Sequence, residues 1–130
     1  MSTFALRKIR GIRLSTINIC QLQIDGECVM DEFEKSIAKN GAYKSEYKKL
    51  LSSIEYFSTG ETLPGTKFKL LKRAKNDTIK DFEFKTNHLR VYGYVDSNGY
   101  IVILCGYKNT QPQDINKMRI LKKTLNIEKK

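Results

Sequence analysis

Five side chains that can transfer protons or bind phosphate lie within ten consecutive positions of the chain. They are a carboxylate, an amine, the only imidazole, a guanidinium and a phenol, carried by Glu83, Lys85, His88, Arg90 and Tyr92. A planar guanidinium can hold two phosphate oxygens at once, and an imidazole exchanges protons near neutral pH. Because alternate residues of a strand share a face, we expect His88, Arg90 and Tyr92 on one face. This spacing predicts a phosphate-binding, proton-transferring site centred on Arg90.

Most of these side chains also have an ordinary structural explanation. Arg90 can pair with Glu83 on a neighbouring strand, and Glu83 can equally pair with Lys85. A lysine on a strand is commonly solvated. His88 lies in an expected turn, where exposure to solvent is ordinary for a histidine. The residue types alone therefore leave both interpretations open.

A basic run and a pair of tyrosines extend this region. Tyr92 and Tyr94 could stack on nucleic-acid bases, although aromatic strand residues more often pack in a core. The basic run could follow a nucleic-acid backbone without reading its sequence. Alternatively, its lysines protect a solvated edge strand from pairing with other chains. The run comprises Lys67, Lys69, Lys72, Arg73 and Lys75.

The chain has an excess of positive charge that is unevenly distributed. Its 130 residues include 24 Lys and Arg against 14 Asp and Glu, a formal net charge of +10. Residues 1–13 form a basic N-terminal arm with four bases and no acids, whereas residues 14–34 contain five acids and no bases. A basic surface attracts polyanions, so nucleic acid, the ribosome or an acidic protein are the expected partners.

Composition and motifs disfavour several other classes of protein. The content of 40% hydrophobic and 10% aromatic residues argues against a disordered chain. No apolar run approaches the roughly 20 residues that cross a bilayer, and the N-terminus does not resemble a secretory signal. Three cysteines without a CxxC pair predict reduced thiols and no zinc site. Nucleotide-binding and metalloenzyme motifs are absent, so we expect no cofactor or metal. The missing apolar span and signal lead us to expect a cytoplasmic protein.

Hydrophobic periodicity predicts one α+β domain over residues 1–130. Alternating or continuous apolar patterns indicate strands at 14–24, 67–72, 79–85, 89–95 and 100–107. Apolar residues at helical spacing indicate a helical hairpin at 31–57 and a final helix that opens at Pro112 and Asp114. The expected sheet is mainly antiparallel. We also expect a bulge near Cys20, a helix cap at Asp31 and a type I′ turn at Asn98-Gly99.

The C-terminal half resembles RelE/HigB-type toxins of bacterial toxin–antitoxin systems, and most closely the phage-derived HigB-like branch of the RelE/ParE superfamily. Residues 82–94 (FEFKTNHLRVYGY) and 98–111 (NGYIVILCGYKNTQ) carry the likeness. That branch has an apolar-Glu-apolar-Arg strand, then an aromatic-Arg strand. An apolar strand follows and ends in a Gly-Phe-x-Lys-Lys-Thr-Gln-like turn before a basic helix. The likeness covers about residues 63–125.

The resemblance implies an α+β, RelE-like fold and a metal-independent endoribonuclease that cleaves mRNA on the translating ribosome. A cognate antitoxin would neutralise it. Arg90 would then be central, with Lys85 and Lys108 neutralising phosphate and Asn109 as a further contact. From the residue types, His88 is the candidate base and Glu83 is an alternative.

The chain departs from the family pattern at several positions. Lys85 stands where the branch usually has Arg, and Tyr107-Lys108-Asn109 replaces an aromatic residue followed by two lysines. Asp81 and Glu83 stand where ribosome-cutting RelE relatives carry lysines. Two alternatives therefore stay open. One is the same fold without nuclease activity, binding gyrase or only an antitoxin, and the other is an unrelated basic nucleic-acid-binding domain.

Overall fold

A single mixed sheet and three helices form the protein in a computed structural model that describes residues 2–72 and 77–128. The strands are β1 (Phe4–Lys8), β2 (Ile19–Ile24), β3 (Glu27–Cys28), β4 (Phe68–Leu70), β5 (Asp81–Lys85), β6 (Leu89–Asp96) and β7 (Gly99–Tyr107). The helices are α1 (Val29–Asn40), α2 (Lys44–Ser58), the short 3₁₀ turn η1 (Lys108–Thr110) and α3 (Gln111–Glu128). The predicted α+β class is confirmed.

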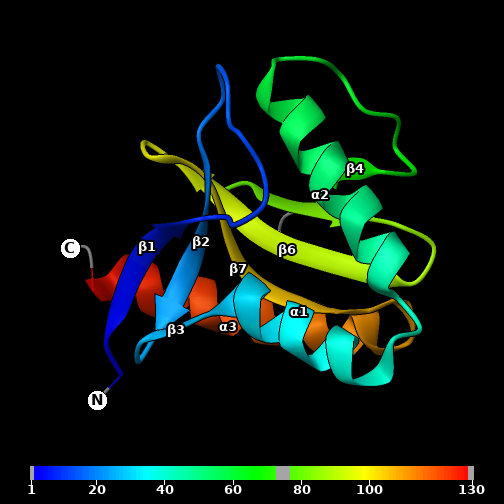
Figure 1. Cartoon of the computed structure of the whole chain (residues 1–130). Helices are drawn as coiled ribbons and strands as arrows, with labels where there is room; N and C mark the ends of the chain where they lie inside the picture. Colours follow the sequence, from blue (N-terminus) through cyan, green and yellow to red (C-terminus); the bar gives the residue numbers. More distant parts are fainter. Residues whose placement is uncertain (1, 73–76, 129–130) are drawn as a thin grey trace.

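The sheet has the strand order β1-β2-β7-β6-β5-β4, and β3 pairs with β2. Strands β2 and β7 run parallel, and the other pairs are antiparallel. Helices α1 and α2 pack on one face, and α3 packs on β6 and β7 from the other face (Figure 1). The apolar run of β7 is therefore covered on both faces, as its continuous pattern predicts.

The apolar stripe of α2 fixes this helix against β4 and β5. Leu50, Ile54 and Phe57 are buried along one helix face. The ring of Phe57 lies 4.4 Å from that of Phe68 and 5.4 Å from that of Phe84, measured between centroids. Such aromatic contacts orient the two elements as well as bury area. The stripe therefore fixes the orientation of α2, and polar residues beside the stripe lie near the β5–β6 end of the sheet.

Several local expectations are wrong. The residue at the N-cap of α1 is Cys28, whereas Asp31 lies in the first turn. The side chain of Gln21 instead accepts the buried N–H of Met30 at 2.9 Å, so a residue of β2 supplies the cap from outside the helix. Helix α1 ends at Asn40, and its C-cap residue Gly41 has a left-handed φ of 77°.

The expected bulge and turn type differ as well. Strands β1 and β2 pair residue by residue through Cys20, and the irregularity lies instead between Tyr92 and Gly93 of β6. The β6–β7 hairpin exists, but Asp96 pairs with Gly99 across it. A type I′ turn needs positive φ at two central residues, and Asp25 is the only non-glycine with positive φ among the described residues.

The remaining differences concern an additional strand, the length of a predicted strand and the buried residues of α3. The basic N-terminal arm contains β1, the edge strand of the sheet. The strand predicted at 67–72 is only three residues long. The buried residues of α3 include the charged Lys122 beside the apolar Met118 and Leu125.

Candidate functional site

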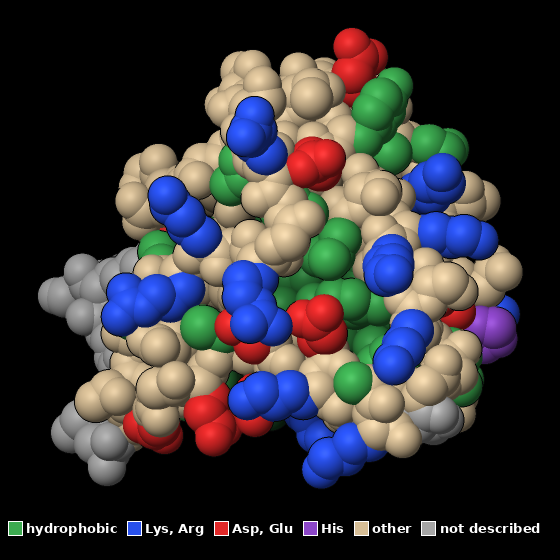
Figure 2. Space-filling model, in the orientation of Figure 1, with side chains coloured by type: hydrophobic (Ala, Val, Ile, Leu, Met, Phe, Trp, Pro, Cys, Tyr) green, Lys and Arg blue, Asp and Glu red, His purple; other side chains and the backbone are tan. Residues whose placement is uncertain are grey.

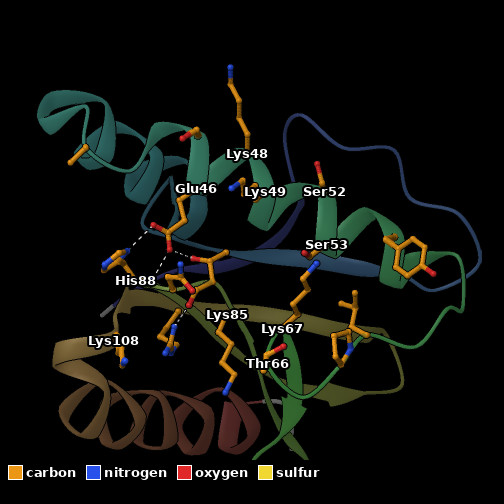
Figure 3. A pocket seen from close by; sticks show the side chains of 18 of the residues that line it. Glu46, Lys48, Lys49, Ser52, Ser53, Thr66, Lys67, Lys85, His88 and Lys108 are labelled. Atoms are coloured by element: carbon orange, nitrogen blue, oxygen red, sulfur yellow. Dashed lines mark hydrogen bonds and ion pairs between the residues drawn. The ribbon is translucent and has the colours of Figure 1, made fainter.

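An open groove of about 1270 Å³ lies between α2 and the β5–β6 end of the sheet (Figure 3). One wall is the polar face of α2. The opposite wall comes from the segment after α2, from the β5–β6 turn at 86–88 and from Lys108, the first residue of η1. Of the predicted site residues, the groove gathers Lys67, Lys85, His88, Arg90 and Lys108.

The groove is strongly basic. Among its described lining residues, Glu46 is the only acid, and six are Lys or Arg: Lys48, Lys49, Lys67, Lys85, Arg90 and Lys108. Like charges gathered in one concave surface raise the local concentration of anions. Figure 2 shows basic side chains spread over one face of the molecule, with the only histidine at its right edge.

Glu46 of α2 holds the β5–β6 turn through both carboxylate oxygens. Its Oε2 lies 3.0 Å from Nδ1 of His88, and its Oε1 accepts the backbone N–H of His88 and the hydroxyl of Thr86. Partial burial raises the pKa of Glu46, but these hydrogen bonds outweigh burial, and the net pKa lies below its usual value. The carboxylate is therefore ionised at neutral pH.

This contact orients the exposed imidazole of His88. Its side chain is 59% exposed, against 17% for Glu46. The ring of Tyr43 lies 5.2 Å from the imidazole ring and supports it from the side. Because Nδ1 is held by a carboxylate, Nε2 is the ring nitrogen that a substrate can reach.

The guanidinium of Arg90 is mostly committed to the protein itself. Arg90 is only 6% exposed, and its Nη1 donates to the carbonyl oxygens of Thr86 at 2.5 Å and Leu89 at 2.8 Å. Its Nε is buried without a hydrogen-bond partner. Arg90 therefore braces the turn that carries His88 and adds positive charge beneath the groove.

Lys85 and Glu83 are engaged with each other on the side of the sheet that faces α3. The amine of Lys85 lies 3.7 Å from Oε1 of Glu83, as does the amine of Lys69. The other carboxylate oxygen of Glu83 accepts an N–H of Gln111 at 2.9 Å. In Figure 3 the amine of Lys85 points away from α2. The ion-pair interpretation of Glu83 and Lys85 thus describes this structure.

The structure places Tyr92 and Tyr94 outside the groove. Both are buried, at 0% and 1% exposure, in the cluster between the sheet and α3. Burial raises the pKa of Tyr92, and its hydroxyl has no hydrogen-bond partner. Neither ring is accessible to a base in this conformation, so the packing interpretation applies to both.

The other predicted nucleic-acid contacts are dispersed. Lys69 lies on β4 and pairs with Glu83, and Lys72 is exposed beyond that strand. Asn109 is exposed in η1 but does not line the groove. Arg73 and Lys75 lie outside the described residues. Of the described members of the basic run, only Lys67 lines the groove.

Sequence reasoning missed the contribution of α2. Glu46, Lys49 and Ser53 line the groove from this helix, at i, i+3 and i+7, which places them on one helical face. The signal was a polar row beside the apolar stripe, in which each member directly precedes a buried residue. The pattern does not reveal that this row faces a turn some forty residues later in the chain.

Comparison of the chain with models of protein families, with curated proteins and with solved structures finds no match. Within residues 2–72 and 77–128, no helix is long and apolar enough to span a membrane. The same residues contain no group of three or more His, Cys, Asp or Glu side chains placed to hold a metal ion. What the fold and geometry define is an α+β protein with a basic groove and one carboxylate-held histidine.

Proposed function

We propose that the protein binds RNA in the basic groove and cleaves it without a metal ion, as the resemblance to RelE/HigB-type toxins implies. The observation that carries the proposal is the position of His88. The only imidazole of the chain is exposed, is oriented by an ionised carboxylate and lies among the lysines of a groove. These are the components that RNA cleavage needs, namely a base near the 2′-OH and cations near the phosphate.

The chemistry follows from these positions. Nε2 of His88 accepts the proton of a ribose 2′-OH, and the 2′-oxygen attacks the adjacent phosphorus. The bond from phosphorus to the 5′-oxygen breaks, which leaves a 2′,3′-cyclic phosphate and a 5′-hydroxyl that takes its proton from water. Lys108 and the charge of Arg90 stabilise the phosphate oxygens while negative charge accumulates. Glu46 stabilises the imidazolium that forms.

The biological setting belongs to the same proposal. The resemblance implies mRNA on the ribosome as the substrate, a cognate antitoxin as the inhibitor and the cytoplasm as the location. An antitoxin that silences this activity would cover the groove or hold the basic α3. A complex that leaves both surfaces exposed would contradict this part of the proposal.

The decisive experiment compares wild type with His88→Ala on messenger RNA in the presence of a metal chelator. We expect wild type to cut, with ends mapped by primer extension, and the variant to cut about 10²–10⁴-fold more slowly. Binding of RNA to the variant should change little. Lys44→Ala is the matched control, because Lys44 is exposed on the same helix that carries Glu46 but does not line the groove. Intact message with wild type, or cutting by His88→Ala at the wild-type rate, would exclude the proposal.

A second function, binding without cleavage, is favoured by one observation. Two of the three cations that the resemblance places at the phosphate, Arg90 and Lys85, are occupied by contacts within the protein. On this alternative the chain binds another target, such as gyrase, or only an antitoxin. Expression that arrests growth while message stays uncut would support this alternative.

A further inference from the structure

The groove has two chemically different ends. At the His88 end lie Lys108 and the buried guanidinium of Arg90, whereas the amine of Lys85 is turned toward Glu83. At the opposite end the described lining residues are uncharged: Ser52, Ser53, Tyr56, Thr62, Leu63, Pro64 and Thr66. Between the two ends lie Lys49 and Lys67. A ligand that fills the groove therefore presents negative charge at one end and a neutral, partly apolar group at the other.

Tyr56 provides an exposed aromatic ring at the neutral end. It is 50% exposed, and it is one of only four exposed large apolar side chains among the described residues. The other three, Leu6, Leu70 and Ile120, do not line the groove. The neighbouring Phe57 is buried in the core, so Tyr56 is not needed for packing α2 to the sheet.

The distance between the two ends matches a short stretch of single-stranded nucleic acid. Glu46, Lys49, Ser53 and Tyr56 follow one face of α2, ten residues from first to last. At about 1.5 Å per residue this face is about 15 Å long, which spans about four nucleotides of a stacked strand. In Figure 3 the amine of Lys67 reaches toward Ser53 between the two ends, where the connecting phosphates would lie.

We propose that the Tyr56 end of the groove is a nucleobase-binding subsite for single-stranded RNA, which rests on the proposed RNA binding. An unpaired base stacks on the phenol ring of Tyr56. The hydroxyls of Ser53 and Thr66 can both donate and accept hydrogen bonds, so they can contact the edge of that base. A paired base in a duplex has both faces covered and cannot stack on the ring.

The test measures binding separately from cleavage. The probe is a fluorescent single-stranded oligonucleotide of about six nucleotides, matched to a groove-sized site. It carries 2′-O-methyl groups, so it cannot be cut by 2′-OH attack. A second probe has the same sugar-phosphate backbone without bases, and a third is a duplex. Anisotropy titrations compare wild type, Tyr56→Ala, Tyr56→Phe and the exposed, distant control Ile120→Ala.

We expect Tyr56→Ala to weaken binding of the single strand about 5- to 100-fold, the range found when one base loses its aromatic partner. Tyr56→Phe and Ile120→Ala should bind like wild type, and all four proteins should have the same melting temperature. The abasic probe should bind wild type and Tyr56→Ala equally. The duplex should bind more weakly than the single strand and be insensitive to Tyr56.

Three results would overturn the subsite. They are equal binding of the single strand by wild type and Tyr56→Ala, an equal loss for the abasic probe, and no binding of the single strand at all. The outcome is separable from the cleavage proposal. Base-dependent binding at Tyr56 without RNA cleavage would support the subsite and contradict the proposed nuclease activity. RNA cleavage with binding that does not depend on Tyr56 would support the nuclease activity and contradict the subsite.

Discussion

The carboxylate of Glu46 holds His88 at two points: Oε2 lies 3.0 Å from Nδ1 of the ring, and Oε1 accepts the backbone N–H. The two residues are 42 positions apart and belong to different elements. Helix α2 therefore fixes both the position and the ring orientation of the imidazole on the β5–β6 turn. This arrangement gives Glu46 a positioning role in any reaction that uses His88.

Replacing Glu46 with Gln should slow RNA cleavage more than it weakens RNA binding. The amide oxygen can still accept the hydrogen bonds of Thr86 and His88, but the substitution removes the negative charge that stabilises an imidazolium. We expect cleavage to fall about tenfold or more, and less than the 10²–10⁴-fold effect of losing the base itself. Single-turnover rates and anisotropy measure the two effects. A variant that cleaves at the wild-type rate would contradict the positioning role.

The stability contributed by Glu46 should depend on pH in the acid range. Its pKa in the folded protein lies below the ordinary value of 4.5. Its contribution is therefore fully present above the unfolded-state pKa and is lost as pH falls through the folded-state pKa. Urea unfolding should show wild type more stable than Glu46→Gln near neutral pH, with the difference shrinking below about pH 4. A difference that is constant with pH would show that the charge contributes nothing.

Removing groove lysines should reduce the salt dependence of RNA binding. Each phosphate contact on a single strand contributes about −0.7 to the slope of log affinity against log salt concentration. Lys49→Gln and Lys67→Gln should each make the slope shallower by about this amount. Lys44→Gln removes the same charge from α2 outside the groove and should leave the slope unchanged. If Lys44→Gln and Lys49→Gln reduced the slope equally, the RNA would be attracted by the overall positive charge and not by defined contacts in the groove.

The parts of the fold that follow from periodic burial could be predicted. The apolar stripe that ends at Phe57 predicted α2, and the apolar alternation around Val91 predicted β6. Elements without an apolar period could not be found in this way. Strand β1 is an exposed edge, and β3 has only two residues. The cap of α1 was also hidden, because Gln21 lies outside the helix.

Only the part of the candidate site whose residues are close in sequence could be predicted. Lys85, His88 and Arg90 lie close in sequence, so their clustering is visible without a structure. Strand alternation placed Tyr92 with them, but it could not show that α3 covers that face and buries the ring. Glu46 and Tyr56 enter through the packing of α2 on the sheet. Which way a helix's polar side faces depends on tertiary contacts that no local pattern records.

Adding a side chain at Gly93 should destabilise the protein. A Cβ there would lie 1.9 Å from the carbonyl oxygen of Ile101 and 2.6 Å from the ring of Phe82. Because backbone cannot yield as a flexible side chain does, Gly93→Ala should cost about 3 kcal/mol and lower Tm by about 10 °C. Gly65→Ala is the matched control, because nothing lies within 4 Å of its added Cβ. Equal melting temperatures would show that the β6 irregularity relaxes easily.

The buried ammonium of Lys122 should be essential for the packing of α3. It lies 2.6 Å from Oδ1 of Asp81, which is fully buried, and also contacts Asp77. Lys122→Ala would leave the Asp81 carboxylate buried with the guanidinium of Arg119 at 3.3 Å as its charged partner. Leaving a buried charge wholly unpaired costs about 3–5 kcal/mol, and because Arg119 keeps part of the compensation we expect a loss of about 3 kcal/mol.

The neighbouring Lys123 is exposed and provides the control for this prediction, since Lys123→Ala should change stability by less than about 0.5 kcal/mol. Adding Asp81→Asn to Lys122→Ala should recover part of the lost stability, because it removes the buried charge that has lost its ammonium partner. Urea unfolding of wild type, Lys122→Ala, Asp81→Asn and the double variant gives the coupling directly. Strictly additive losses would mean that Lys122 stabilises α3 through its aliphatic stem, and that the charge pair contributes nothing to holding the helix on the sheet.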